Sequence, residues 1–451
     1  MTELTRGSQS FDNKIKNRIP PAPYMKICIV GLGYVGLPLA CAFANLHTVY
    51  GYDVSSDKIT SLQEGHSYIE DISQKTLRPL LNTSFFPTTD PCCMEACDYI
   101  IICVPTPLDK KKTPQLEYVI AASETISTHL KKGHLVILES TTYPGTTEEV
   151  VIPLLEKSGL KAGKDFGVGY SPERIDPGNP RFTVENTPKV VGALTDHDLA
   201  RIIELYSSVI KNVIPVKDLK TAEASKILEN VFRAVNIALI NEMALIFERM
   251  GIDIWEVIKA ASSKKPNSFM PHFPGVGVGG HCIPLDPYYL SWKAKKIGHL
   301  ARLIELSGEI NDYMPLHTLY MILNALKGKR RLEDSKVTIF GVAYKKNISD
   351  TRESPALQLI ELLQDYHIQV VYHDPHVDHI HTRHGMMKRQ SVEESVAHSD
   401  CIVFTIDHAE FASLDLNLLR SLMRTPIIVD GKNVVQSAGG FFYYGIGKVN
   451  V

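Results

Sequence analysis

The sequence has neither the charge nor the apolar runs that would direct it to nucleic acid or into a membrane. Its 48 basic and 50 acidic side chains leave a formal net charge of -2, which gives no electrostatic footprint for nucleic acid. No run approaches the roughly 20 uninterrupted apolar residues of a membrane span, and the polar first residues lack the apolar core of a signal peptide. We expect a cytoplasmic protein without a nucleic-acid or membrane partner.

Cysteine pairs with metal-binding or redox spacing are also missing, although the chain contains 8 cysteines. None forms a CxxC pair, so we predict reduced thiols and no metal cofactor. The stretch 373–384 is rich in histidine, but its spacing fits no single metal site. We interpret it as a solvated loop after a strand, with adventitious metal affinity as the alternative. Its histidines are His373, His376, His379, His381 and His384.

What is present is an alternation of apolar, β-branched runs with helical stretches, up to about residue 217 and again from about 330. Between them, the segment from Thr221 to Gly251 has no internal proline or glycine and predicts one long helix. Apolar residues occupy nearly all of its circumference, so we expect it to be buried between domains or at a subunit interface. A further helical stretch, 294–327, contains Pro315, which we expect to kink it or to start a new helix.

This pattern predicts an α/β protein with two doubly wound, Rossmann-like domains joined by a central long-helix region. The length of 451 residues is in line with more than one core. The expected boundaries are a polar N-terminal extension at 1–24, a first α/β domain at 25–218, a helical region at 219–328 and a second α/β domain at 329–451.

The motif GLGYVG follows the first expected strand and opens a helix. Glycines at 31, 33 and 36 let a pyrophosphate approach backbone amides at the helix N-terminus. Asp53 ends the next strand, where an acidic side chain binds the adenosine ribose hydroxyls and repels a 2'-phosphate. The sequence therefore predicts NAD as the cofactor, against the alternative of a tight turn that binds nothing.

A second motif, GVGVGGHCIPLDP, places Cys282 and Asp286 beside four glycines. The glycines free the backbone to close on a ligand. A cysteine in such a polar loop, with a carboxylate four residues on, can attack an aldehyde whose adduct is then oxidised to a thioester. The alternative is that Cys282 is a small buried apolar residue like most of the other cysteines.

Lys226 and Asn230 are spaced i,i+4 on the predicted long helix, so both side chains leave the same face. Here a lysine can stabilise a developing alkoxide or oxyanion, with the asparagine holding substrate or water. The alternative is a lysine that reaches solvent at the helix surface.

Seven motifs together resemble the UDP-glucose/GDP-mannose dehydrogenase family, over about residue 25 to 435. In chain order they are GLGYVG, CVPTP, LESTTYPGTTEE, YSPERIDPGN, EASKILEN, GVGVGGHCIPLDP and AYKKNISDTRESP. The loop GGHC is most similar to members that act on UDP-N-acetyl-D-glucosamine, because UDP-glucose members typically have GGSC. The chain departs from UDP-glucose members at Leu285, where they have a lysine, so their cofactor contact there is in doubt.

The resemblance implies an NAD-dependent, four-electron oxidation of the C6 hydroxyl of a UDP-N-acetylhexosamine to a uronic acid, for surface polysaccharide biosynthesis. We expect UDP-N-acetyl-D-glucosamine, with UDP-N-acetylgalactosamine, UDP-N-acetylmannosamine and UDP-glucose left open. A two-electron dehydrogenase of the hydroxyacid type needs no cysteine and is one alternative. A non-catalytic protein that binds NAD or a nucleotide sugar is the other.

Carried over to matching positions, the resemblance also implies individual roles. Cys282 becomes the nucleophile and Lys226 steadies the oxyanion. Asp286 with Asn230 positions water or serves as base, and Glu173 is the base for hydrolysis, with Thr142 close to the reacting nicotinamide. The implied NAD contacts are Gly31, Gly33, Tyr34, Val35, Gly36, Asp53, Lys58, Pro105, Thr106, Thr142 and Arg352. The implied substrate contacts are Glu173, Arg174, Lys226, Asn230, Gly279, Gly280 and Lys345.

At the level of domains, the resemblance implies NAD binding by the first α/β domain, dimerisation by the helical region and UDP-sugar binding by the second α/β domain. We expect a homo-oligomer, either a dimer or a dimer of dimers. Lys264 and Lys265 are both candidates for a side chain that crosses the subunit interface to the substrate.

Overall fold

The computed structural model describes residues 24–69, 72–109, 111–174, 184–264, 269–280, 282–437 and 439–449. By its internal contacts the chain divides into two compact units, Met1–Lys226 and Ile227–Val451. The expected N-terminal extension, apart from Tyr24, lies outside the described residues, and so does Lys265. The finer division into four segments stays a prediction.

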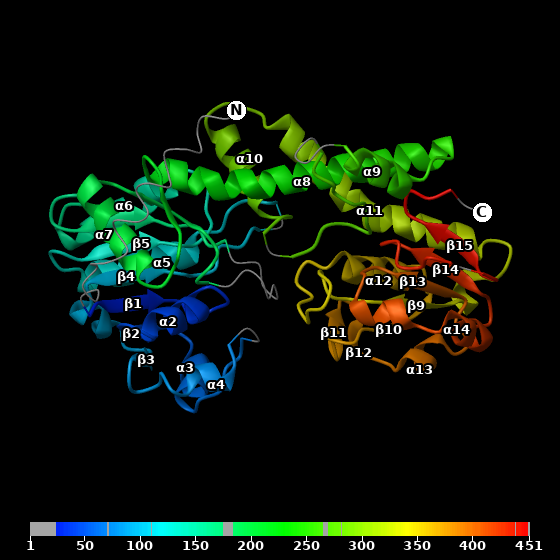
Figure 1. Ribbon diagram of the computed structural model, residues 1–451, viewed down its shortest axis with the longest axis horizontal. Helices are drawn as coiled ribbons and strands as arrows, with labels where there is room; N and C mark the ends of the chain where they lie inside the picture. The colour runs from blue at the N-terminus through cyan, green and yellow to red at the C-terminus, as the bar shows by residue number, and fades with distance from the viewer. Residues whose placement is uncertain are drawn as a thin grey trace. The chain divides into compact units, whose positions relative to one another are not determined.

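The first unit is built on an eight-stranded sheet with the order β3-β2-β1-β4-β5-β6-β7-β8 (Figure 1). Strands β1 to β6 are parallel neighbours in the order 3-2-1-4-5-6 of a dinucleotide-binding fold. β7, however, pairs antiparallel with β6, so it begins at the edge where the parallel strands end. The strands are β1 Lys26–Val30, β2 Thr48–Tyr52, β3 Phe85–Thr88, β4 Tyr99–Ile102, β5 Leu135–Leu138, β6 Gly167–Tyr170, β7 Lys189–Ala193 and β8 Val213–Pro215.

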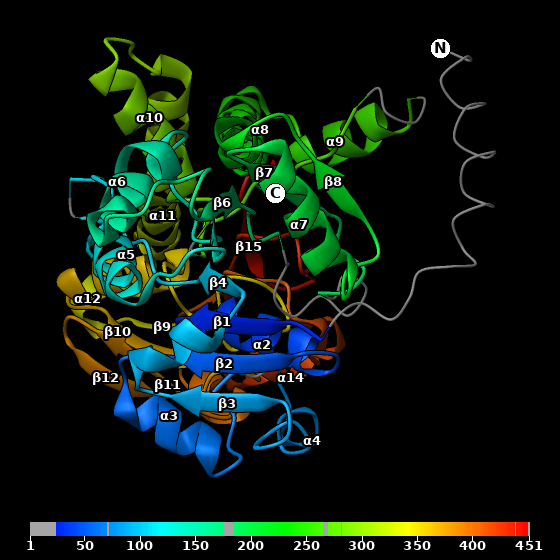
Figure 2. The same ribbon diagram turned by 90° about the vertical axis from the view of Figure 1, so that its left-hand side faces the viewer.

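Both faces of this sheet are covered, because successive residues of each strand point to opposite sides. Ile27 and Ile29 of β1 join one core, whereas Cys28 and Val30 join the other. Helices α5 and α6 cover one face and α7 the opposite one (Figure 2). The helices are α2 Gly36–Ala44, α3 Ser56–Gln63, α4 Gln74–Leu77, α5 Glu117–His129, α6 Ile152–Leu155 and α7 Asp196–Ser207, with shorter turns η1 Pro91–Ala96, η2 Thr147–Val151 and η3 Glu156–Ser158.

The second unit contains a five-stranded parallel sheet of order β10-β9-β13-β14-β15, the other common doubly wound arrangement. Its strands are β9 Lys336–Phe340, β10 Gln369–His373, β13 Cys401–Phe404, β14 Ile427–Asp430 and β15 Phe442–Gly445. Its helices are α9 Ile254–Ser262, α10 Asp286–Lys296, α11 Arg302–Leu326, α12 Pro355–Asp365, α13 Val392–Val396 and α14 Leu416–Leu422, with turns η4 Leu332–Asp334 and η5 Ala409–Ser413. The predicted fold, two doubly wound α/β parts with long helices between them in the sequence, is confirmed.

The long helix α8 spans Leu219–Met250 and carries the chain from the first unit into the second. It begins before Thr221, the start that the sequence predicted, because the Asp218 side chain accepts the Thr221 N–H at 2.8 Å and caps the helix. Gly251, with φ of 72°, ends it as predicted. Among the described residues it is the one helix long and apolar enough to cross a membrane, a test that core helices of soluble proteins also pass.

Two other sequence-based expectations need correction. Pro315 does not start a new helix, because it lies inside α11 and removes only one backbone N–H, while the alternative of a kink stays a prediction. The helical stretch breaks earlier, at Gly298, whose φ is 81°. The histidine-rich stretch is not a simple loop, because His379–Thr382 and Gly385–Lys388 pair as the antiparallel hairpin β11–β12.

Candidate functional site

The glycine turn after β1 is shaped by close backbone contacts. Gly31 has φ of 93°, and a Cβ there would lie 2.8 Å from the Cys103 carbonyl oxygen. A Cβ on Gly36, at the start of α2, would lie only 1.9 Å from the Gly31 carbonyl oxygen. Gly33, in contrast, has no atom within 4 Å of its Cβ position, and α2 begins without a side-chain cap. The turn therefore offers an open helix N-terminus to a pyrophosphate.

Asp53 is tied directly to this turn. Its carboxylate accepts the Leu32 N–H at 2.9 Å and the Ser55 N–H at 3.0 Å, and it is 6% exposed. Lys58 Nζ lies 3.1 Å from the same carboxylate. The acidic group at the end of β2 is thus fixed beside the glycines, as binding of an adenosine ribose requires.

A second group of candidate site residues in the first unit lies at the ends of β4 and β5. Thr106, which follows exposed Pro105, donates from Oγ1 to the Thr141 carbonyl at 2.7 Å and so joins the two loops. The next residue, Thr142, is fully buried, and its hydroxyl has no hydrogen-bond partner among the described residues. Such an orphaned buried hydroxyl is costly unless a ligand satisfies it, so the loop fits a bound cofactor.

Helix α8 holds the same segment through a residue that the sequence did not single out. The buried Glu223 carboxylate accepts the Gly145 N–H, the Thr147 N–H at 2.9 Å and the Thr147 hydroxyl at 2.7 Å. Burial raises the pKa of Glu223 to about 7. One turn further on, Lys226 is 7% exposed, which disfavours the alternative of a lysine that reaches solvent.

Glu173 and Arg174 follow β6 at the same edge of the sheet. Glu173 Oε2 lies 3.5 Å from Nζ of Lys189, another residue that the motif analysis missed. Arg174 donates from Nη1 to the Pro188 carbonyl at 3.0 Å. A buried lysine at the start of the apolar run KVVGAL was the signal that could have identified this contact.

In the second unit, the structure brings Cys282, Asp286 and Asn230 together. The Asp286 N–H donates to the Cys282 carbonyl at 2.8 Å, where α10 begins. The Asn230 side-chain amide, on α8, donates to the buried Asp286 carboxylate. Cys282 is half-buried, whereas the alternative required a fully buried thiol. Leu285, which stands where UDP-glucose members have a lysine, immediately precedes α10.

The glycine loop before Cys282 packs on the segment 344–355. A Cβ on Gly279 or Gly280 would lie within 2.9 Å of Tyr344 side-chain atoms, and the Gly280 N–H donates to the Arg352 carbonyl at 3.1 Å. Arg352 forms a forked ion pair with Asp350, and half-buried Lys345 lies in the same segment. Two motifs far apart in the sequence therefore form one surface of the second unit.

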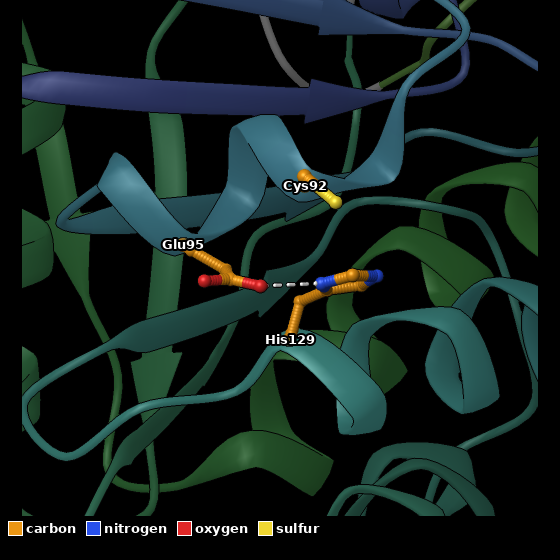
Figure 3. Close-up of side chains that lie close together, drawn as sticks. All are labelled: Cys92, Glu95 and His129. Atoms are coloured by element: carbon orange, nitrogen blue, oxygen red, sulfur yellow. Dashed lines mark hydrogen bonds and ion pairs between the residues drawn. The ribbon is translucent and has the colours of Figure 1, made fainter.

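Two further groups of ligand-type side chains lie outside these sites. Cys92, Glu95 and His129 converge on the surface of the first unit, where His129 Nδ1 pairs with Glu95 at 2.9 Å (Figure 3). In the second unit, His376 and Glu410 approach His408. His408 already accepts the Asn347 N–H and pairs with buried Asp374 at 3.1 Å, so both of its ring nitrogens are engaged.

Comparison with known proteins gives three family matches that follow one another along the chain. The UDP-glucose/GDP-mannose dehydrogenase family, NAD binding domain, matches residues 25–210. The central domain of the same family matches 220–313, and its UDP binding domain matches 338–437.

Individual relatives cover nearly the whole chain. The chain is 39% identical to a UDP-N-acetyl-D-glucosamine 6-dehydrogenase of Pseudomonas aeruginosa, over 88% of this chain and 94% of that one. The structure of a UDP-D-ManNAc dehydrogenase from Pyrococcus horikoshii has a TM-score of 0.87 at 35% identity, covering 95% and 100% of the two chains. The structure of an NDP-N-acetyl-D-galactosaminuronic acid dehydrogenase from Methanosarcina mazei has a TM-score of 0.83 at 31% identity, covering 95% of this chain and 96% of that one.

Proposed function

The chain belongs to the UDP-glucose/GDP-mannose dehydrogenase family and is an NAD-dependent UDP-sugar dehydrogenase, and from this premise we propose that it oxidises UDP-N-acetyl-D-glucosamine at C6 to the carboxylate. The observation that carries the proposal is the half-buried Cys282 thiol in a glycine loop, four residues before a carboxylate held by Asn230. A two-electron dehydrogenase would need no such cysteine. The product would serve surface polysaccharide biosynthesis.

In the proposed reaction NAD supplies the hydride acceptor for both oxidations. Asp286, with Asn230, takes the proton of the C6 hydroxyl directly or through water as C6 loses its first hydride. The Cys282 thiolate then bonds to the aldehyde carbon, and the buried Lys226 ammonium stabilises the oxyanion of the thiohemiacetal. Loss of the second hydride gives a thioester on the same sulfur.

Hydrolysis completes the proposed cycle. Glu173 removes a proton from water, the resulting hydroxide attacks the thioester carbon, and the carbon–sulfur bond breaks to release the acid and the Cys282 thiolate. Per sugar, two NAD are reduced and one water is consumed. One cation at Lys226 can serve each oxyanion, because the same carbon carries it in every step.

The choice of sugar rests on the GGHC loop and on the Pseudomonas relative, whereas the other two relatives are named for different epimers. NADH formation measured in parallel with UDP-N-acetylglucosamine, UDP-N-acetylgalactosamine, UDP-N-acetylmannosamine and UDP-glucose tests the proposal. We expect the highest kcat/KM with the first and two NADH per sugar. One NADH per sugar would indicate a hydroxyacid-type reaction, and none with any of the four would indicate a binding protein.

We also propose that the chain forms at least a dimer through α8. Large apolar side chains on this helix remain exposed in the single chain, among them Leu228, Leu239 and Met250 at 68%, 51% and 62%. A second copy would remove this apolar surface from water. A solution mass by light scattering near that of one chain, 50.3 kDa, would contradict the proposal.

A further inference from the structure

A buried charged cluster whose members have no role implied by the family resemblance lies beside Glu173. Lys189 Nζ is 2.8 Å from Glu139 Oε2, and the two side chains are 6% and 0% exposed. The Tyr206 hydroxyl, from α7, donates to the other Glu139 oxygen. The Lys189 ammonium also lies 5.2 Å from the centre of the Tyr206 ring. Charged groups this deeply buried are retained only with close partners, and here each has one.

The antiparallel direction of β7 brings Lys189 to this place. Tyr170 of β6 pairs with Gly192 of β7, and the same register continued toward the edge sets Lys189 opposite Glu173. The distance between Lys189 Nζ and Glu173 Oε2 is 3.5 Å. A parallel β7 would have placed its first residue at the opposite edge of the sheet, away from Glu173.

One ammonium therefore faces two carboxylates. Burial acts to lower the pKa of Lys189, but Glu139 and then Glu173 outweigh it and raise this pKa, so the ammonium stays charged. Glu139 holds the closer position and receives the Tyr206 hydrogen bond, which leaves Glu173 at a longer distance. Glu173 Oε2 is thus held 3.5 Å from a fixed positive charge that pairs more closely with Glu139.

We propose that Lys189, held by Glu139 and Tyr206, is a positioning residue that orients the Glu173 carboxylate for thioester hydrolysis. This inference rests on the function proposed above for Glu173. The ionisable groups that surround the Glu139–Lys189 pair are Glu173, Tyr206 and the Cys103 thiol that follows β4.

Two single substitutions should shift the pH dependence of hydrolysis in opposite directions. Lys189→Met leaves two carboxylates without their shared cation, so the acidic limb of the pH–rate profile for hydrolysis should move up by roughly one pH unit. Glu139→Gln leaves Glu173 as the one carboxylate paired with Lys189 among the described residues, so the acidic limb should move down by about as much. The measurement is the decay of the acyl-enzyme in a single turnover, acid-quenched and followed by intact mass from pH 5 to 9.

The controls separate this inference from the proposed function. Lys189→Arg keeps the charge, so its acidic limb should lie at the wild-type pH. The double variant Lys189→Met/Glu139→Gln removes both buried charges, so its acidic limb should lie between those of the single variants. Glu173→Gln should accumulate the thioester; if it does not, the function proposed for Glu173 fails. If the thioester accumulates in Glu173→Gln while both single variants keep the acidic limb of the wild-type pH profile, the inference about Lys189 is overturned. Should Lys189→Met not fold, the direction of the Glu139→Gln shift decides alone.

Discussion

The Asn230 side-chain amide donates a hydrogen bond to the Asp286 carboxylate, and this bond joins α8 to the first residue of α10. The Asp286 N–H in turn holds the Cys282 carbonyl at 2.8 Å. A carboxylate that is nearly fully buried thereby receives a hydrogen bond from a side chain of α8, which offsets part of the cost of its burial. The backbone of Cys282 is therefore held at the same helix start.

Replacing this thiol tests the covalent mechanism. In Cys282→Ala we expect formation of the acid from UDP-N-acetylglucosamine to fall at least roughly a thousandfold, because no sulfur remains to carry the thioester. The dissociation constant for NAD, measured by calorimetry, should stay within about twofold. Cys92→Ser, at an exposed thiol of the first unit, is the matched control and should turn over normally. Normal acid formation by Cys282→Ala would end the covalent proposal.

The orphaned hydroxyl of Thr142 gives a prediction in which stability and activity change in opposite directions. Thr142→Val removes a buried hydroxyl that has no partner among the described residues, so the protein without cofactor should be as stable or up to about 1 kcal/mol more stable. If the hydroxyl contacts the bound cofactor, kcat/KM should fall roughly tenfold or more. Thermal unfolding and NADH assays measure the two effects.

Thr146→Val is the matched control for this change, because Thr146 is equally buried but donates to the Tyr143 carbonyl at 2.6 Å. It should destabilise the protein by about 1 kcal/mol, since it removes the side-chain hydrogen bond to that carbonyl and leaves it with the Thr146 N–H alone of these two donors. Equal destabilisation by both variants would show that the Thr142 hydroxyl is satisfied in the absence of cofactor.

Two glycines of the turn after β1 should respond differently to alanine. In Gly33→Ala the new methyl group meets no protein atom, so the melting temperature should hardly change, while the NAD dissociation constant should rise roughly tenfold or more because the methyl group blocks the pyrophosphate. In Gly36→Ala the methyl group would lie 1.9 Å from the Gly31 carbonyl oxygen. That variant should lose roughly 1–3 kcal/mol of stability from overpacking. Unchanged NAD affinity in Gly33→Ala would place the pyrophosphate elsewhere.

Much of the fold could be predicted because its central strands are continuous apolar runs. The sequences YIII of β4 and LVIL of β5 are buried at every position, as strands covered on both faces must be. The direction of β7 could not be predicted, since a buried strand has the same pattern in a parallel and an antiparallel pair. The β11–β12 hairpin was missed because its histidines obscured the alternation.

For the candidate site, motif spacing identified residues that act near their neighbours in sequence, such as Gly31 and Asp53. It did not identify the buried partners that come from distant segments. Glu139 and Lys189 are separated by 50 positions, and Glu223 and Gly145 by 78. Such pairs are set by how strands and helices assemble, and a single sequence carries only the hint of a charged residue inside an apolar run.

Glu223 should make the stability of the loop it holds depend on pH. Burial raises its pKa to about 7 in the folded protein, against about 4.5 in the unfolded chain. Between these values the folded state keeps a proton that the unfolded state has released, so this contribution to stability is complete below pH 4.5 and is lost as the pH rises through about 7. Glu223→Gln cannot ionise, so relative to wild type it should become more stable with rising pH, by up to roughly 3 kcal/mol at pH 8.

Hydrogen exchange of the peptide 143–151, corrected for the intrinsic rate at each pH from 5 to 8, measures this difference as a free energy of opening. The strand Cys401–Phe404 of the second unit serves as the internal control, because its opening should be equal in both proteins at every pH. If the free energy of opening of the loop peptide changes with pH in the same way in wild type and Glu223→Gln, the three donors from Gly145 and Thr147 outweigh burial and keep Glu223 ionised throughout. The loop beside Thr142 would then be held by a permanent charge, and the pH dependence of turnover would have to come from other groups.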